Sequence, residues 1–107
     1  MRFRSPSEHT IDGKHLAAEL QVFFTSEILN GTLVLSYLID IAEDDSEDLT
    51  TFLASTTETE GWFAIDSDGF SSWNFADLLT FNSNFWMYYG SLTDGDCDEG
   101  ISWTIFK

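Results

Sequence analysis

Positively charged residues are scarce in this sequence. Its 107 residues include four lysines and arginines but 19 aspartates and glutamates, which gives a formal net charge of −15. This charge argues against nucleic acid and anionic lipid surfaces as partners, because both are polyanions. Such an acidic chain is typical of a protein that stays soluble in an acidic or saline compartment. The alternative is docking to a basic protein surface.

Long apolar runs are also missing. No run reaches the roughly 18 residues that a membrane-spanning helix needs, so we expect no transmembrane segment and a soluble or peripheral protein. Residues 1–5 lack the apolar stretch of a signal peptide.

Groups that form disulfides or bind metals are few. Cys97 is the single cysteine of the sequence, which excludes an intrachain disulfide. The two histidines, His9 and His15, are six positions apart and do not have the spacing of a paired metal site.

Bulky apolar residues are plentiful. Hydrophobic residues make up 43% of the chain, with ten phenylalanines, four tryptophans and three tyrosines. This content supplies a core and argues against disorder. The length suits one small domain over residues 1–107 rather than two.

The patterns of apolar residues predict a mainly β fold with a few short helices. Residues 33–41 form a nearly continuous β-branched and aromatic run, which is typical of a strand buried on both faces. Residues 85–89 and 101–106 are strands on composition, with a loop over 90–100 between them. Residues 14–24 fit either a helix or a strand. Short helices are expected over 47–55 and 74–79, and residues 56–72 are polar and rich in turn residues.

Two local motifs point to ligands or modification. Residues 94–100 have the alternating aspartates of a calcium loop, but the glycine falls one place late and Ile105 replaces the bidentate glutamate. A solvated acidic loop is the simpler interpretation. Asn30 begins an N-x-Thr sequon, which is a glycosylation site if the protein is secreted.

Two longer segments resemble the α-type carbonic anhydrases. Residues 5–20, which include Ser-Pro-Ser-Glu-His-Thr and Ala-Ala-Glu-Leu, are similar to the family's A-P-S-E-H-T-x-x-G-K stretch and the x-E-x-H that follows it. Residues 86–103 are similar to its Y-P-G-S-L-T-T-P-P-C-x-E-x-V-x-W stretch. The resemblance covers most of the chain, is weakest over 42–80, and implies part of the family's twisted mixed sheet with short helices.

The resemblance also locates the family's three zinc-binding histidines. Two of them form an H-x-H pair at the positions of Arg2 and Arg4, and the third lies at Gln21. Bound zinc lowers the pKa of its water to about 7 and so supplies hydroxide at neutral pH. Arginine stays protonated and offers no lone pair, and an amide is a poor ligand for zinc. The sequence therefore predicts no metal, no other cofactor and no catalysis.

Other family positions are retained. Thr93 matches the threonine that hydrogen-bonds the zinc hydroxide, Glu8 matches the glutamate that orients that threonine, and Glu19 matches the partner of the third histidine. We interpret them as vestigial catalytic positions with structural hydrogen bonds. Residues 94–96 replace the family's T-P-P, which removes a rigid wall and adds negative charge. We also expect a guanidinium to bridge Glu19 and fill the space of the metal.

The ends of the chain bear on its partners. Cys97 matches a cysteine that secreted members pair with one in their N-terminal region, which is absent here, so it is a candidate for a disulfide to a missing region or another chain. A sheet without its flanks leaves open edges. Either the chain is part of a longer protein, or another chain completes the sheet, or the relative is stripped down.

These observations favour a non-catalytic carbonic anhydrase-like protein that serves as a structural or accessory subunit of a larger assembly. One alternative is a divergent carbonic anhydrase that hydrates CO₂ with an altered metal site. Another is an acidic, calcium-associated secreted protein. Other protein subunits are the expected partners, with no nucleic acid. The expected compartment is extracellular, secretory or the lumen of an organelle.

Overall fold

A seven-stranded sheet dominates the fold. The computed structural model describes residues 1–28, 31–44, 47, 50, 54, 56–59, 62–65 and 84–106. The strands are β1 (Arg2–Arg4), β2 (Thr10–Ile11), β3 (Lys14–His15), β4 (Ala18–Ser26), β5 (Gly31–Ile39), β6 (Thr56–Thr59), β7 (Trp62–Ile65), β8 (Phe85–Ser91) and β9 (Glu99–Phe106). Their order in the large sheet is β6-β7-β1-β4-β5-β9-β8, and β2 and β3 form a separate two-stranded ribbon.

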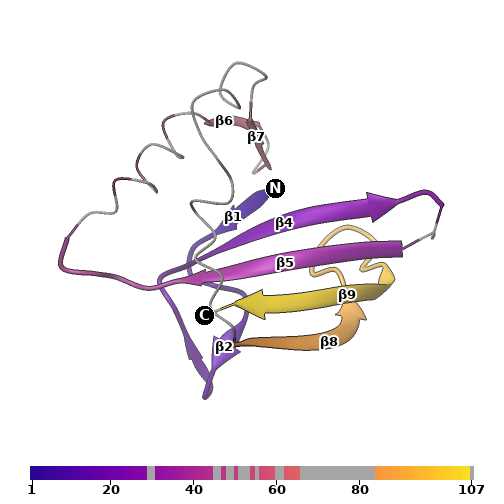
Figure 1. The fold of residues 1–107 in the computed structure, drawn as a ribbon, viewed down its shortest axis with the longest axis horizontal. Helices are drawn as coiled ribbons and strands as arrows, with labels where there is room; N and C mark the ends of the chain where they lie inside the picture. Colours follow the sequence, from indigo (N-terminus) through magenta and orange to yellow (C-terminus); the bar gives the residue numbers. More distant parts are fainter. Residues whose placement is uncertain are drawn as a thin grey trace.

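The large sheet is mixed and visibly twisted (Figure 1). Neighbouring strands are antiparallel except for β5 and β9, which run parallel from the pair Thr32 and Ile101 to the pair Tyr37 and Phe106. The expectation of a mainly β, twisted mixed sheet is confirmed.

The central hairpin explains why residues 14–24 were ambiguous on local pattern. Strands β4 and β5 pair without interruption from Ala18 and Ile39 to Ser26 and Gly31. Both faces of β4 are buried where it starts, so its sequence lacks the alternation of a half-exposed strand. The pairing with β5 therefore decides for strand over helix.

Each face of this sheet has its own small core. Strand alternation puts Leu20 and Val34 on opposite faces, because Leu20 pairs with Tyr37 and the two faces alternate along β5. Leu20 packs with Met1, Phe3, Val22, Tyr37 and Ile39. Val34 packs with Ile101 and Trp103, with Phe23 and Leu92 against them.

Most other expectations for individual segments can be compared with the structure. The strands expected at 33–41, 85–89 and 101–106 correspond to β5, β8 and β9, and the connection between β8 and β9 is shorter than expected because both strands extend into it. The interpretation of 56–72 as turns is wrong for its first half. There β6 and β7 pair from Thr56 and Ile65 to Thr59 and Trp62, and pairing with the apolar β7 outweighs the polar composition of β6.

The expected helices fall largely outside the described residues. The helix at 74–79 lies wholly outside them, as does Asn30 of the sequon. Of the helix expected at 47–55, the structure describes Glu47, Thr50 and Ala54, and all three have helical backbone.

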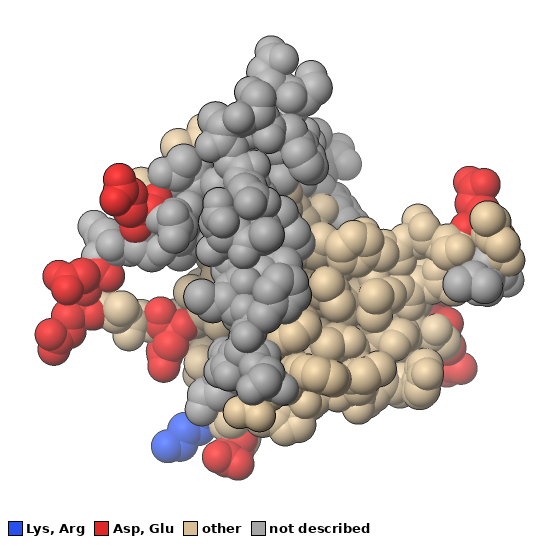
Figure 2. Space-filling model, viewed as in Figure 1, with Lys and Arg blue, Asp and Glu red and all other residues tan. Residues whose placement is uncertain are grey.

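Acidic side chains lie around the rim of the molecule in the view of Figure 2, while the visible part of the sheet that is described is free of charge at its centre. No helix within the described residues is long and apolar enough to cross a membrane.

We predict that Leu20→Ala lowers the free energy of unfolding by about 2–5 kcal/mol, because it leaves a cavity in a fully buried site. Leu33→Ala is the matched control, since Leu33 is 37% exposed on the same sheet, and it should cost about 1 kcal/mol or less. Urea denaturation measures both. Equal losses would show that Leu20 does not anchor its face of the sheet.

Candidate functional site

The site is built on the pairing of β1 with β4. Arg2 lies opposite Gln21, and Arg4 lies opposite Glu19. Alternation along each strand places these four residues on one face of the sheet, as the sequence predicts. The three positions that the resemblance assigns to zinc ligands are therefore neighbours.

Both arginines bind the carboxylate of Asp94, which lies in the turn between β8 and β9. Nη1 of Arg2 forms an ion pair with Oδ2 of Asp94, and Nη2 of Arg4 lies 3.3 Å from the same oxygen. Arg2 is buried, and its guanidinium also lies over the ring of Phe23 at 5.9 Å. The negative charge at position 94 thus compensates the two positive charges on β1.

This pairing corrects one expectation. The sequence suggests that a guanidinium bridges Glu19, but within the described residues both arginines form ion pairs with Asp94, and Arg4 also pairs with Glu8. Nε of Arg4 lies 3.3 Å from Oε1 of Glu8, within ion-pair distance but without hydrogen-bond geometry. Asp94 reaches the arginines because the turn folds back over β1, and a turn conformation is not visible in residue spacing.

Glu8 joins the two sides of the site. Its Oε2 accepts a hydrogen bond of 2.9 Å from the hydroxyl of Thr93 and another of 2.9 Å from Nε2 of Gln21. The same amide nitrogen donates to Oε1 of Glu19 at 2.8 Å. Because carboxylates only accept, the NH₂ group of Gln21 must face both of them. The structure thus brings together Glu8, Thr93 and Glu19.

Glu19 is fully buried and accepts hydrogen bonds on both oxygens. Oε2 accepts from the backbone N–H of His9 at 2.8 Å. Oε1 accepts from Nδ1 of His9 at 2.7 Å, from Ser36 at 2.7 Å and from Gln21. Burial alone would raise the pKa of Glu19. The bonds from His9, Gln21 and Ser36 outweigh it and lower the pKa to about 2.

His9 extends this network to the edge strand. Its Nε2 lies 2.7 Å from the hydroxyl of Tyr88, and its ring meets those of Tyr88 and Trp103 edge-on. The carboxylate of Glu19 only accepts, so Nδ1 of His9 carries the proton and donates to it. Nε2 of His9 then accepts from the hydroxyl of Tyr88. Burial, followed by the charges of Glu19 and Glu8, raises the pKa of Tyr88, which keeps its proton in place.

We call this set of side chains the arginine cluster. Its members are Arg2, Arg4, Glu8, Glu19, Gln21, Thr93 and Asp94. It contains two guanidiniums and three carboxylates, and both guanidiniums form ion pairs with carboxylates of the cluster. Arg2, Arg4 and Gln21 point N–H donors at the carboxylates around them, and a guanidinium has no lone pair for a metal. This donor set does not fit zinc.

The remaining candidate residues lie apart from this cluster. Cys97 is exposed in the β8–β9 turn, with a positive φ of 54°, and its N–H donates to the carbonyl of Asp94 at 3.2 Å. Nδ1 of His15 lies 2.6 Å from the carbonyl oxygen of Ser7. Because a carbonyl oxygen only accepts, this nitrogen is the donor. In the calcium-like segment 94–100, the residues after Asp94 are exposed to solvent, whereas Asp94 itself forms ion pairs with the two arginines.

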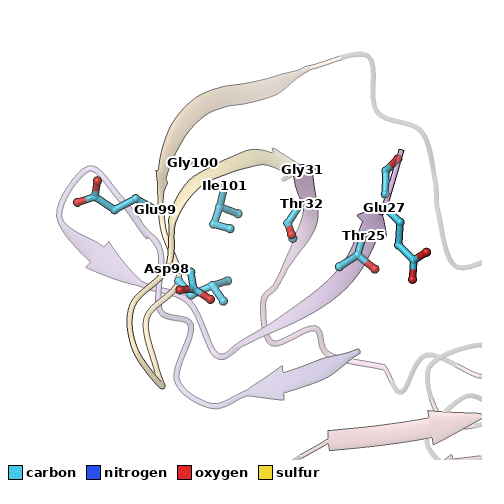
Figure 3. A pocket seen from close by; sticks show the side chains of 10 residues that line it. Thr25, Glu27, Gly31, Thr32, Asp98, Glu99, Gly100 and Ile101 are labelled. Atoms are coloured by element: carbon cyan, nitrogen blue, oxygen red, sulfur yellow. The ribbon is translucent and has the colours of Figure 1, made fainter. Parts of the chain in front are cut away.

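A separate hollow of about 310 Å³ lies where the β4–β5 hairpin turn approaches the start of β9 (Figure 3). Asp98, Glu99 and Glu27 are among its lining residues. In Figure 3 the side chains of Glu27 and Glu99 extend on opposite sides and away from one another. Within the described part of the chain, no group of three or more histidine, cysteine, aspartate or glutamate residues is arranged to hold a metal ion.

The geometry can now be set against known proteins. A sequence model of the eukaryotic-type carbonic anhydrases matches residues 2–107. The chain belongs to this family.

Individual carbonic anhydrase relatives support the assignment. Alpha carbonic anhydrase 2 of Arabidopsis thaliana is 29% identical over 113 residues, which covers 100% of this chain and 42% of the relative. Dioscorin DB3S of Dioscorea polystachya is 30% identical, covering 100% of this chain and 39% of the relative. The solved structure of the Photobacterium profundum alpha-carbonic anhydrase has a TM-score of 0.78 and 28% identity, covering 98% of this chain and 46% of that one.

The chain thus spans less than half the length of the carbonic anhydrase relatives it matches.

Two features of the site were missed by sequence reasoning. Asp94 had a signal: an acid replaces the family's threonine in a chain where two arginines replace histidines, and opposite changes of charge suggest contact. The link from Glu19 through His9 to Tyr88 had none, because 79 positions separate the histidine and the tyrosine.

The buried carboxylate of Glu19 should make stability depend on pH. Its folded pKa of about 2 lies below the ordinary 4.5, so the ionised form stabilises the fold above about pH 4.5, and this contribution is lost as the pH falls through about 2. We predict that Glu19→Gln costs about 1.5–3 kcal/mol at pH 7 and flattens the stability profile in that window.

Chemical denaturation from pH 7 to pH 2 measures this effect. Glu43→Gln is the matched control, because Glu43 is exposed. Its profile should follow that of the parent protein, and a Glu19→Gln profile that also did so would contradict the assignment.

Asp94→Asn should remove the carboxylate that forms an ion pair with the buried Arg2. We predict that Asp94→Asn costs about 1–3 kcal/mol of unfolding free energy, measured by urea denaturation. Asp96→Asn removes the same charge from an exposed position in the same turn and should change stability by less than about 0.5 kcal/mol. Similar losses of unfolding free energy in the two variants would show that the effect comes from the net charge of the chain and not from the ion pair.

Proposed function

We propose that this chain is a non-catalytic member of the carbonic anhydrase family that holds no zinc and acts by binding other protein subunits. The observation that carries the proposal is the arginine cluster. At the three positions that resemble zinc ligands, the chain has two guanidiniums and an amide, and a carboxylate from a distant turn binds both arginines.

The chemistry of these groups argues against zinc-dependent hydration of CO₂. Zinc catalysis needs neutral histidine nitrogens and an open position for water. Here the positions that resemble the zinc ligands hold Arg2, Arg4 and Gln21 and no histidine, although Thr93 still donates to Glu8 at 2.9 Å as the resemblance implies. Glu8 also accepts a hydrogen bond from the amide of Gln21. These groups therefore hold β1, β4 and the β8–β9 turn together. No catalytic step is assigned to them.

The binding role has two supports. Bulky apolar side chains remain exposed on β8, which suits an interface better than a free surface. A fold also does not dictate one function, and relatives of this chain include a protein named as dioscorin and one named as a putative carbonic anhydrase-like protein. The match of Cys97 to a cysteine of secreted members supports a secretory or lumenal location as part of the proposal.

Zinc content and CO₂ hydration test the proposal directly. We expect the purified protein, incubated with zinc and dialysed, to retain far less than one equivalent by elemental analysis. Its hydration rate in a stopped-flow assay should equal the uncatalysed rate. Stoichiometric zinc with catalysis would overturn the proposal in favour of a divergent enzyme.

A rebuilt site separates loss of ligands from loss of the fold. A variant with Arg2→His, Arg4→His, Gln21→His and Asp94→Thr restores the family residues at all four positions and should bind about one zinc per chain. The matched control keeps Gln21 and carries the other three changes, and it should bind zinc more weakly. Equal failure of both to bind zinc would show that the side chains at these positions are not the reason for its loss.

A further inference from the structure

Strand β8 forms one edge of the large sheet. The strand order ends at β8, and within the described residues its strand partner is β9. In the part of the chain that the structure describes, the outer row of its backbone N–H and C=O groups has no strand partner, which is the usual hazard of an edge. Figure 1 shows β8 as the outermost strand, beyond β9.

This edge lacks the usual protection against pairing. Natural edge strands are short, charged, kinked by bulges or interrupted by proline. Strand β8 is seven residues long, and residues 84–93 contain neither a charge nor a proline. Tyr89 stands where the similar family stretch has proline, so an amide N–H is present where proline would have none. The one irregularity, between Gly90 and Ser91, lies at the end of the strand.

The side chains of β8 are exposed to an unusual degree for apolar groups. Tyr89 is 81% exposed and Met87 is 59% exposed, and Phe85, Trp86 and Tyr88 are each about half exposed. With about 200 Å² for each large side chain, the strand presents roughly 500–600 Å² of apolar surface. This area is divided between the two faces of the sheet, because successive side chains alternate. A standard interface uses about 800 Å² from each partner, so the apolar area offered by the strand is of the same order.

We propose that β8 pairs with β8 of a second copy of this chain, antiparallel, so that two sheets join into one. An antiparallel pair of identical strands has the two-fold symmetry of an ordinary homodimer, and its aromatic residues lie opposite one another. The charge pattern favours a second copy over a basic partner. The acidic residues that would attract a basic surface are absent from the strand, and two chains of charge −15 can meet where neither has a charge.

This inference rests on the proposed function only in that both place the chain in an assembly. The edge strand lies outside the arginine cluster except at Tyr88, which reaches it through His9. Zinc content and hydration decide the proposal above, and the mass of the particle decides this one, so either can fail alone.

Sedimentation velocity and light scattering of the purified chain test the pairing. We expect twice the chain mass of 12.1 kDa at about 100 µM, a concentration at which a complex with a Kd of about 1 µM is almost fully formed. Met87→Lys puts a charge into the paired strand, and Tyr89→Pro restores the proline of the family. Each should raise the dissociation constant by at least about tenfold.

Ile41→Lys is the matched control, because Ile41 is 85% exposed and lies after the end of β5, away from the edge. It should leave the dissociation constant unchanged, and circular dichroism should show that all variants keep the sheet. Hydrogen exchange gives an independent measurement, since amides of β8 should gain protection at high concentration.

A parent chain that stays monomeric at about 100 µM would overturn the proposal, even if the edge binds a different polypeptide. A dimer that survives both edge changes, or one whose protected amides lie outside β8, would overturn it as well.

Discussion

The compensation of two guanidiniums by carboxylates holds this structure together. Arg2 and Arg4 lie on β1, the strand that links β7 and β6 to the rest of the sheet. Arg2 is buried and Arg4 is partly buried, so their charges require nearby acids. Asp94 forms ion pairs with both arginines, and Glu8 forms one with Arg4. The turn between β8 and β9 is thereby tied to the opposite half of the sheet.

The changes at this site form a consistent set. A family that binds zinc has a dication surrounded by neutral histidines and a few carboxylates. Under the proposed loss of zinc, the side chains of Arg2 and Arg4 supply the positive charge of this site, and they lie among the carboxylates of Glu8, Glu19 and Asp94. Gln21 keeps contact with both remaining glutamates through its NH₂ group. Hydrogen bonds and ion pairs thus occupy the acids that would otherwise be buried without partners.

Much of the sheet can be predicted from the sequence, because alternation and composition are local properties. The strand at β5 and the shared face of Arg2, Arg4 and Gln21 follow from a period of two. Strand β6 does not, because its polar residues form a strand through pairing with β7. Residues 14–24 fit two structures locally, and only the partner strand β5 decides between them.

The contacts of the site were harder to predict than its members. Glu8, Thr93 and Glu19 are expected from the resemblance, whereas the roles of Asp94 and Tyr88 depend on contacts of the β8–β9 turn with β1 and of β8 with His9. Spacing along the chain carries no information about such a contact when about 90 residues intervene.

That separation has a consequence for the order of folding. The β4–β5 hairpin closes through near neighbours, but β9 pairs with β5 in parallel across the part of the chain that carries β6, β7 and β8, and the entropy lost in closing this separation makes the pairing slow. Arg2 and Asp94, 92 positions apart, meet only after that step. The ion pairs of the cluster therefore form late and add to the barrier against opening more than to the speed of closing. Their effect would be seen in the unfolding arm of a kinetic chevron, as a lower rate of unfolding.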